Sequence, residues 1–202
     1  EASEPRKISP FDNIGLLDLI VKTGIGEAIA EKLGEMKGNQ GAVAETIENN
    51  VRSKIIKENL TDPAYFAKMS ALLDEIIKLR KEKAIEYEEY LKRIGELAAK
   101  VQAGKSKDTP ETLNTPGKLA LYNNLTPKNS VSEPAMPYGE STGDAVLDLV
   151  LKIDKAVKQA RPDGWRGVQA KEMMVKQAMH KVLNNEEEVE RLFPIIVAHQ
   201  EY

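Results

Sequence analysis

The chain has 202 residues, a formal net charge of −3 and no cysteine. The absence of cysteine excludes disulfides, thiolate nucleophiles and cysteine-based zinc sites, and the net charge gives no global argument for binding to nucleic acid. No apolar run is long enough to span a bilayer, and no signal-peptide pattern follows Glu1, so we expect a cytoplasmic piece of a longer polypeptide.

The first sixty residues predict three helices. Apolar residues crowd residues 10–22, which predicts a short buried helix that ends at Gly24-Ile25-Gly26. A second short helix is expected over residues 28–36. Asn39 is placed to cap a third helix, in which apolar residues recur at steps of four, namely Val43, Ile47, Val51 and Ile55.

Residues 63–102 predict one very long helix. Asp62 can accept hydrogen bonds from the first turn, and Pro63 suits the first helical position. Apolar residues then recur at steps of three and four, among them Tyr65, Met69, Leu72, Leu73, Ile76, Leu79, Tyr87, Tyr90, Leu91, Ile94, Leu97, Ala98 and Val101. Such a helix is about 57 Å long. Charges near Arg80 interrupt its apolar seam, which favours a bridging helix over a coiled coil.

The remaining sequence predicts a linker at residues 104–112, a short helix at 117–123 and a proline-rich loop at 126–143. A helix is expected over residues 144–160, and another begins at Trp165. Its apolar residues are Val168, Met173, Val175, Met179 and Leu183. Asn185 is placed to cap a last helix with an acidic first turn.

No convincing alternating strand appears, so the predicted fold is all-α, without significant β-sheet. We expect an irregular bundle built around the long helix. Its domains would be an N-terminal lobe of residues 1–103, a connecting region of residues 104–142, and a C-terminal lobe of residues 143–202 that packs on the long helix.

Several stretches resemble chemical motifs without meeting their requirements. Residues 99–106 approximate a phosphate-binding loop, but a helix rather than a strand precedes them. Residues 23–26 resemble a helix-hairpin-helix turn, yet acidic rather than basic residues follow. His180 and His199 are the only histidines, too few for a histidine-rich metal site or a convincing triad. We therefore expect no catalytic, metal or cofactor site in this chain.

The segment around Trp165 is the best candidate for a contact surface. From Asp144 to Asn185 there are eight Lys or Arg against five Asp or Glu. An aromatic side chain beside cations can anchor a partner protein or approach DNA phosphates. Equally, Trp165 can fill a helix junction while the cations face solvent. The candidate contact residues are Arg161, Trp165, Arg166, Lys171 and Lys176.

Several blocks of the sequence together resemble one known family. They are residues 44–52 (AETIENNVR), 65–70 (YFAKMS), 87–91 (YEEYL), 113–116 (LNTP), 120–125 (ALYNNL), 163–167 (DGWRG) and 199–202 (HQEY). In this order they resemble the C-terminal helical region of the restriction (R, motor) subunit of type I restriction-modification enzymes.

The resemblance implies a parent subunit with a nuclease domain and an ATP-driven DNA translocase, which use Mg and ATP outside this region. It also implies that the C-terminal region docks the motor subunit onto the methyltransferase core of modification and specificity subunits. A non-catalytic docking domain is therefore the first expectation. The alternative is a DNA-contacting module that guides duplex during translocation.

Overall fold

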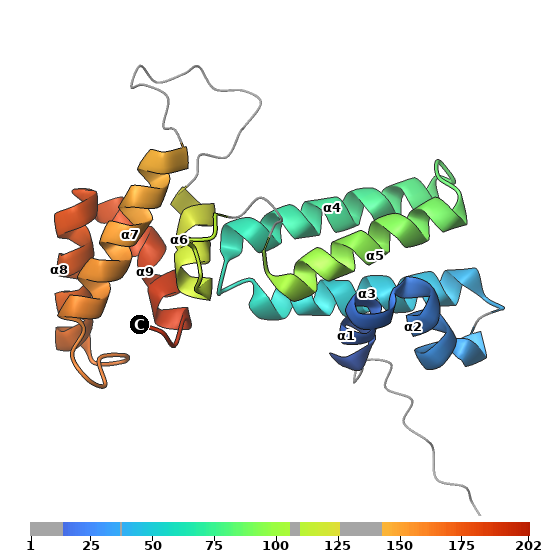
Figure 1. The fold of residues 1–202 in the computed structure, drawn as a ribbon, viewed down its shortest axis with the longest axis horizontal. Helices are drawn as coiled ribbons and strands as arrows, with labels where there is room; N and C mark the ends of the chain where they lie inside the picture. Colours follow the sequence, from blue (N-terminus) through green and yellow to red (C-terminus); the bar gives the residue numbers. More distant parts are fainter. Residues whose placement is uncertain (1–13, 37, 106–109, 126–142) are drawn as a thin grey trace, which may run out of the picture. The chain divides into compact units, whose positions relative to one another are not determined.

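A computed structural model describes residues 14–36, 38–105, 110–125 and 143–202. The described residues are almost all helical and contain no strand, which confirms the all-α prediction (Figure 1). The helices are α1 (Ile14–Thr23), α2 (Ile25–Lys32), the 3₁₀ helix η1 (Gly34–Met36), α3 (Gln40–Glu58), α4 (Pro63–Lys81), α5 (Tyr87–Ala103), α6 (Pro116–Leu125), α7 (Gly143–Ala160), α8 (Gln169–Leu183) and α9 (Glu186–Ala198).

The chain divides into two units, each with its own packing. Of the described residues, those within Glu1–Glu58 and Phe66–Ser106 form unit 1, and those within Asn59–Tyr65 and Lys107–Tyr202 form unit 2. The predicted proline-rich loop and part of the predicted linker lie outside the described residues. The short helix α6 groups with the C-terminal helices rather than with a separate connecting region.

The prediction of one helix over residues 63–102 is wrong. Helix α4 ends at Lys81 and α5 begins at Tyr87, so the two helices form a hairpin. Lys83 adopts a left-handed conformation with φ 53°. The Lys83 amide donates to the Arg80 carbonyl at 3.1 Å and the Ala84 amide to the Leu79 carbonyl at 2.9 Å. This is the Schellman arrangement that ends a helix, with lysine where glycine is usual.

Unit 1 gains core contacts from the hairpin. Helix α5 packs against α1, α2 and α3, so its apolar face meets three helices. Its buried residues are Tyr90, Ile94, Leu97, Ala98 and Val101.

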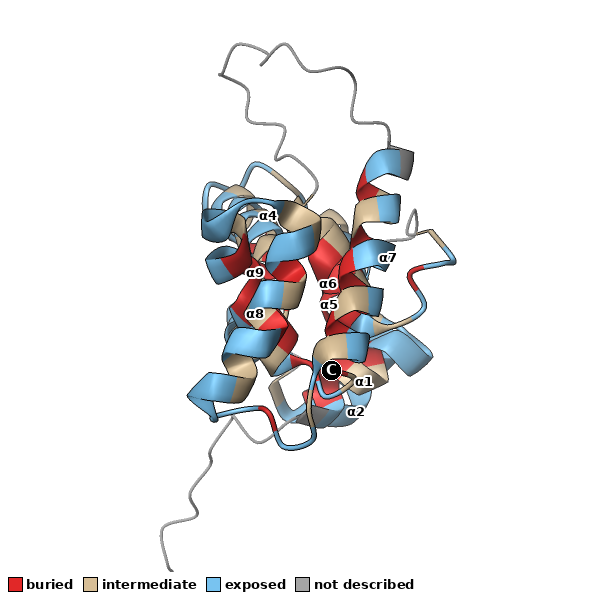
Figure 2. Ribbon diagram, turned by 90° about the vertical axis from the view of Figure 1, so that its left-hand side faces the viewer, coloured by how far each residue is buried: buried red, intermediate tan, exposed pale blue. Residues whose placement is uncertain are grey.

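Unit 2 has a core formed by α6, α7, α8 and α9. Helix α7 packs on α6 and α8, and α9 packs on α6 and α8. Along each helix, buried residues lie on one side and exposed residues on the other (Figure 2). The most buried core residues include Leu121, Val150, Ile153, Val157, Val175, Met179, Leu192, Ile196 and Tyr202.

The predicted helix caps are confirmed. Asn39 Oδ1 accepts from the Ala42 amide at 3.0 Å, and Asp62 Oδ1 accepts from the Tyr65 amide at 3.2 Å. Asn185 Oδ1 likewise accepts from the Glu188 amide at 3.2 Å. Each side chain satisfies an amide that has no partner within its helix.

The helix predicted to start at Trp165 begins later, at Gln169. Gly164 and Gly167 have φ values of 58° and 76°, a conformation that glycine adopts without steric cost. These two glycines hold Trp165 in a turn between α7 and α8. Val168 and Met173, predicted to belong to the apolar face of this helix, are exposed, whereas Val175 and Met179 are buried.

Candidate functional site

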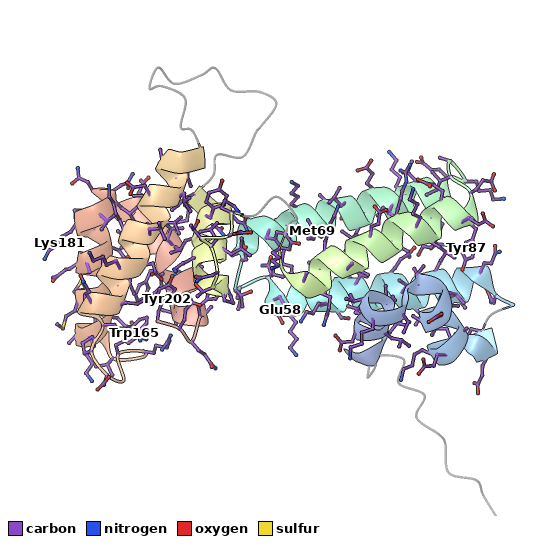
Figure 3. All side chains as sticks on the ribbon, viewed as in Figure 1. Glu58, Met69, Tyr87, Trp165, Lys181 and Tyr202 are labelled. Carbon is purple, nitrogen blue, oxygen red and sulfur yellow. The ribbon has the colours of Figure 1, made fainter. Side chains whose placement is uncertain are left out.

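Trp165 lies at a junction inside unit 2 and is only 2% exposed. Its Nε1 donates a hydrogen bond to the main-chain oxygen of Tyr202 at 2.9 Å. The Arg161 guanidinium donates to the same oxygen, and the Trp165 and Tyr202 side chains lie near each other in Figure 3. The ring of Phe193 lies 5.9 Å from the Trp165 ring, measured between centroids. The indole therefore fills the interior of the unit and also fixes a distant part of the backbone.

Arg166 binds the same part of the chain. Its guanidinium donates to the Val197 carbonyl at 3.0 Å and to the His199 carbonyl at 2.6 Å. It also lies 4.7 Å from the centre of the Trp165 ring, within cation–π distance. Arg166 thus satisfies carbonyls at the end of α9, where helix carbonyls lack partners within the helix.

The two candidate lysines have other partners. Lys171 donates to the Asp163 carbonyl at 2.6 Å. Lys176 Nζ lies 2.7 Å from both carboxylate oxygens of Glu190, and 4.7 Å from the centre of the Phe193 ring. Of the five candidate contact residues, the structure therefore brings together Arg161, Trp165 and Arg166, and it places the lysines at separate positions.

The sequence did not predict that apolar residues at the start of α8 would be exposed to solvent. Met173 and Met174 are 49% and 51% exposed, and Val168 is 43% exposed. The α8 face, as we call these three residues, lies within the same segment as the candidate cations. Exposed methionine is frequent at protein-binding surfaces because its flexible, polarizable side chain adapts to different partners. Both methionines are off the side of α8 that buries Val175 and Met179, and nothing in the sequence pattern marked them as exposed.

Tyr202 is fully buried in a slot between other parts of unit 2. A Cβ atom added at Gly117 would lie 2.5 Å from the Tyr202 ring, so the absence of a side chain at Gly117 makes room for the ring. Lys158 Nζ lies 5.3 Å from the ring centre. Burial, followed by the charge of Asp154, raises the pKa of the Tyr202 hydroxyl. The neighbouring Glu201 carboxylate accepts from Thr115 Oγ1 at 2.7 Å.

A buried carboxylate attaches residues 59–65 to the rest of unit 2. Asp62 is 5% exposed, and its oxygens accept from the side-chain amides of Asn123 at 2.6 Å and Asn124 at 2.8 Å. Burial raises the pKa of Asp62, although these amides, the Tyr65 amide and the nearby His199 oppose the increase. Burial and the charge of Asp62 raise the pKa of the Tyr65 hydroxyl to about 12.

Unit 1 holds a second buried polar network. Arg80 Nε donates to Glu48 Oε1 at 2.8 Å and its NH2 group to Glu48 Oε2 at 3.1 Å, a bidentate pair. The Tyr90 hydroxyl lies 3.1 Å from Glu48 Oε1 and 3.3 Å from the Ala44 carbonyl oxygen. Burial, together with the charge and hydrogen bond of Glu48, raises the pKa of Tyr90. Burial alone lowers the pKa of Arg80, but Glu48, followed by Tyr90 and Glu45, acts in the opposite direction, and the net effect is a raised pKa.

A hollow of about 400 Å³ lies beside this network. Its lining includes Arg80 and Tyr90 from the network, together with Lys83 and Tyr87 from the hairpin. Glu48 already binds the guanidinium of Arg80 through two hydrogen bonds. Because its guanidinium is already paired with Glu48, Arg80 is poorly placed to bind an anionic ligand in this hollow.

Two kinds of site are absent from the residues that the structure describes. Among them, no three side chains of His, Cys, Asp or Glu gather closely enough to hold a metal ion. No helix in this part of the chain combines the length and the hydropathy needed to cross a membrane. The chain was compared with protein-family models, with curated proteins and with solved structures, and none of the three comparisons gave a match.

Proposed function

We propose that this chain is a protein-docking domain from the C-terminal region of the restriction subunit of a type I restriction-modification enzyme. In this role it joins the nuclease and ATP-dependent DNA translocase to the methyltransferase core of modification and specificity subunits, in the cytoplasm. The chain itself is non-catalytic, and the parent subunit uses ATP and Mg in its other domains.

The observation that carries this proposal is that the blocks of family resemblance meet through specific side-chain bonds. Glu48, in the block 44–52, binds Tyr90, in the block 87–91. Trp165 and Arg166, in the block 163–167, bind the main chain of the block 199–202. These residues stabilise the fold. Their occurrence in the same order as in the family therefore supports a fold shared with that family, rather than a shared catalytic site.

The α8 face is the surface that we assign to the partner. Val168, Met173 and Met174 are exposed, and Gln169 and Gln177, one helical turn on either side of Met173, are exposed polar residues. An apolar centre with a polar rim is the usual anatomy of a protein–protein interface. The modification and specificity subunits are proposed as the occupant because the family resemblance implies them.

The alternative, a DNA-guiding module, has weaker support. It requires cations that can approach phosphates, yet Arg161, Arg166 and Lys171 donate to main-chain carbonyls of unit 2. Lys176 pairs with Glu190. These bonds occupy some of the hydrogen-bond donors that a bound duplex would use. The DNA alternative predicts duplex binding that weakens steeply as salt rises, because bound counterions are released from the phosphates.

Substitution on the α8 face tests the docking proposal. The double variant Met173→Glu and Met174→Glu is placed in the full restriction subunit, which is then purified with the modification and specificity subunits. We expect association to weaken by about tenfold or more, because burying charge at an interface centre is costly. Leu151→Glu is the matched control, since Leu151 is an exposed apolar residue of α7 in the same unit. Equal association of both variants and the wild type would exclude the α8 face.

A further inference from the structure

Residues 199–202 occupy a slot that has the features of a peptide-binding site. The Tyr202 slot is formed by Thr115, Gly117, Asp154, Lys158, Arg161 and Trp165. We propose that this slot recognises a peptide that carries Glu-Tyr in a turn conformation, and that residues 199–202 fill it as a detachable strap of the same chain. This proposal does not rest on the docking function and concerns a different surface.

Recognition begins with the main chain. The main-chain oxygen of Tyr202 accepts hydrogen bonds from two donors, the Arg161 guanidinium and Trp165 Nε1. Arg166 adds a third donor through its 2.6 Å bond to the His199 carbonyl. Bonds to the main chain provide affinity that is largely independent of peptide sequence, whereas side-chain pockets provide specificity.

Two side-chain subsites select the sequence. Tyr202 is fully buried, with Gly117 against its ring and Lys158 Nζ at 5.3 Å from the ring centre. Thr115 Oγ1 donates to the Glu201 carboxylate at 2.7 Å, which sets the preference for an acidic residue before the tyrosine. A flat aromatic ring fits because position 117 carries no Cβ atom, and a carboxylate fits because a hydroxyl faces it.

The strap is suited to release. It follows the end of α9 at Ala198 and adds no helix of its own. The buried Tyr202 hydroxyl has no partner at hydrogen-bond geometry, and Asp154, whose carboxylate is close enough to raise the pKa of that hydroxyl, is itself paired with Lys158 at 2.6 Å. A buried hydroxyl without a good partner loses its hydration and regains little. Unlike an apolar anchor of the same size, this tyrosine therefore regains hydration when it leaves the slot.

The test uses the full chain with the two anchoring side chains of its strap removed, so that the probe peptide competes only with the main chain of the strap. The double variant Glu201→Ala and Tyr202→Ala leaves every slot residue in place, and Trp165 is the only tryptophan of the chain, so its fluorescence reports on the slot. The probe is an acetylated peptide with the sequence of residues 197–202. We expect saturable binding that shields Trp165 from an aqueous quencher. A control peptide with alanine in place of the tyrosine should not bind.

A third substitution checks the assigned donors. Adding Arg161→Ala to the double variant should weaken peptide affinity by about tenfold or more, since a hydrogen bond to a charged donor is lost. Absence of saturable binding to a double variant that keeps its helical circular dichroism would overturn the proposal. So would equal binding of the control peptide.

If the double variant does not fold, hydrogen exchange of the wild-type chain decides the question. The Tyr202 amide donates to the His199 carbonyl at 3.3 Å and is thereby protected while the strap is in place. A detachable strap predicts that this amide exchanges faster than the amides in the middle of α7 and α9. Exchange at the same rate as those helices would show that the strap leaves only when unit 2 unfolds, which contradicts the proposal.

Discussion

Arg80 and Glu48 form a bidentate ion pair inside unit 1, with side-chain exposures of 19% and 8%. Neither charged group is fully hydrated, so each relies on the other to offset the free-energy cost of its lost hydration. Buried pairs of this kind contribute little net stability relative to apolar residues, but removing one partner leaves an uncompensated charge. The pair also ties α3 to the α4–α5 hairpin, because Tyr90 of α5 binds the same carboxylate.

The Arg80–Glu48 pair predicts a strongly non-additive double substitution. Arg80→Met alone should destabilise unit 1 by about 3 kcal/mol, since Glu48 remains buried without its partner. Combining it with Glu48→Leu should recover most of that loss, because the Tyr90 hydroxyl keeps the Ala44 carbonyl as a partner. Urea unfolding followed by circular dichroism measures both variants. Equal destabilisation by the single and double variants would contradict this interpretation.

The left-handed Lys83 predicts a stabilising glycine. A residue with a Cβ atom in this conformation costs about 1–2 kcal/mol relative to glycine, and Lys83 has φ 53°. Lys83→Gly should therefore raise the free energy of unfolding of unit 1 by about 1 kcal/mol. Lys92→Gly is the control, since Lys92 is exposed in the middle of α5, where glycine should destabilise by about 1 kcal/mol. Destabilisation by both changes would argue against the observed turn.

Gly117 predicts a clash that depends on the strap. Alanine at this position would place a methyl group 2.5 Å from both Glu201 Oε1 and the Tyr202 ring, and overpacking of this kind costs about 1–3 kcal/mol. The loss should disappear when Gly117→Ala is combined with Glu201→Ala and Tyr202→Ala. Unfolding of unit 2 is followed by Trp165 fluorescence.

The comparison is Gly26→Ala in α2 of unit 1, where nothing outside the residue's own helix backbone and chain neighbours lies within 4 Å of the added Cβ position. That change should stabilise slightly through helix propensity. Because unit 1 holds no tryptophan, its unfolding is followed by circular dichroism. If Gly117→Ala were equally harmless in the otherwise unchanged chain, Tyr202 would not occupy the slot against α6.

Asp62 predicts a pH dependence of unit 2 stability. Its pKa in the folded chain is raised from 3.8, chiefly by burial, so the neutral carboxyl group is favoured by folding. The contribution is fully present below the unfolded pKa and is lost as pH rises through the higher folded pKa. The free energy of unfolding of the wild type minus that of Asp62→Asn should therefore decrease as pH rises from below 3.8. An unchanged or increasing difference would show that the carboxylate is not penalised by burial.

Local features of this fold could be predicted from sequence, because their causes lie within a few residues. Asn39, Asp62 and Asn185 cap helices as predicted, since a cap needs only a short polar side chain beside the first free amides. The apolar residues of α3 at steps of four are buried for the same local reason. Helix type and approximate position follow from such patterns.

The hairpin between α4 and α5 could not be predicted in the same way. Residues 82–86 contain neither glycine nor proline, and Lys83 carries no residue signal for a left-handed conformation. The turn forms because α5 finds apolar surface on α1, α2 and α3, a relationship that lies outside any local window. The charged residues near Lys81 were interpreted as a break in the apolar seam of one long helix. They lie instead at the C-terminal end of α4.

The roles of the candidate site residues also depended on distant contacts. Trp165 and Tyr202 are 37 positions apart, and nothing in the spacing shows that one binds the main chain of the other. The cations around Trp165 suggested a contact surface, yet Arg161 and Arg166 hold carbonyls of the same unit. The exposure of Met173 depends on which side of α8 faces α7, which is decided by tertiary packing.

Direct binding to the methyltransferase core tests the central proposal most plainly. The 202-residue chain is mixed with purified modification and specificity subunits, and complex formation is measured by sedimentation velocity over a range of concentrations. We predict a saturable complex that persists at moderate salt and is weakened about tenfold or more by Met173→Glu with Met174→Glu, whereas Leu151→Glu has no effect. No complex with the core at any concentration, from a chain that retains its helical circular dichroism, would contradict the proposal.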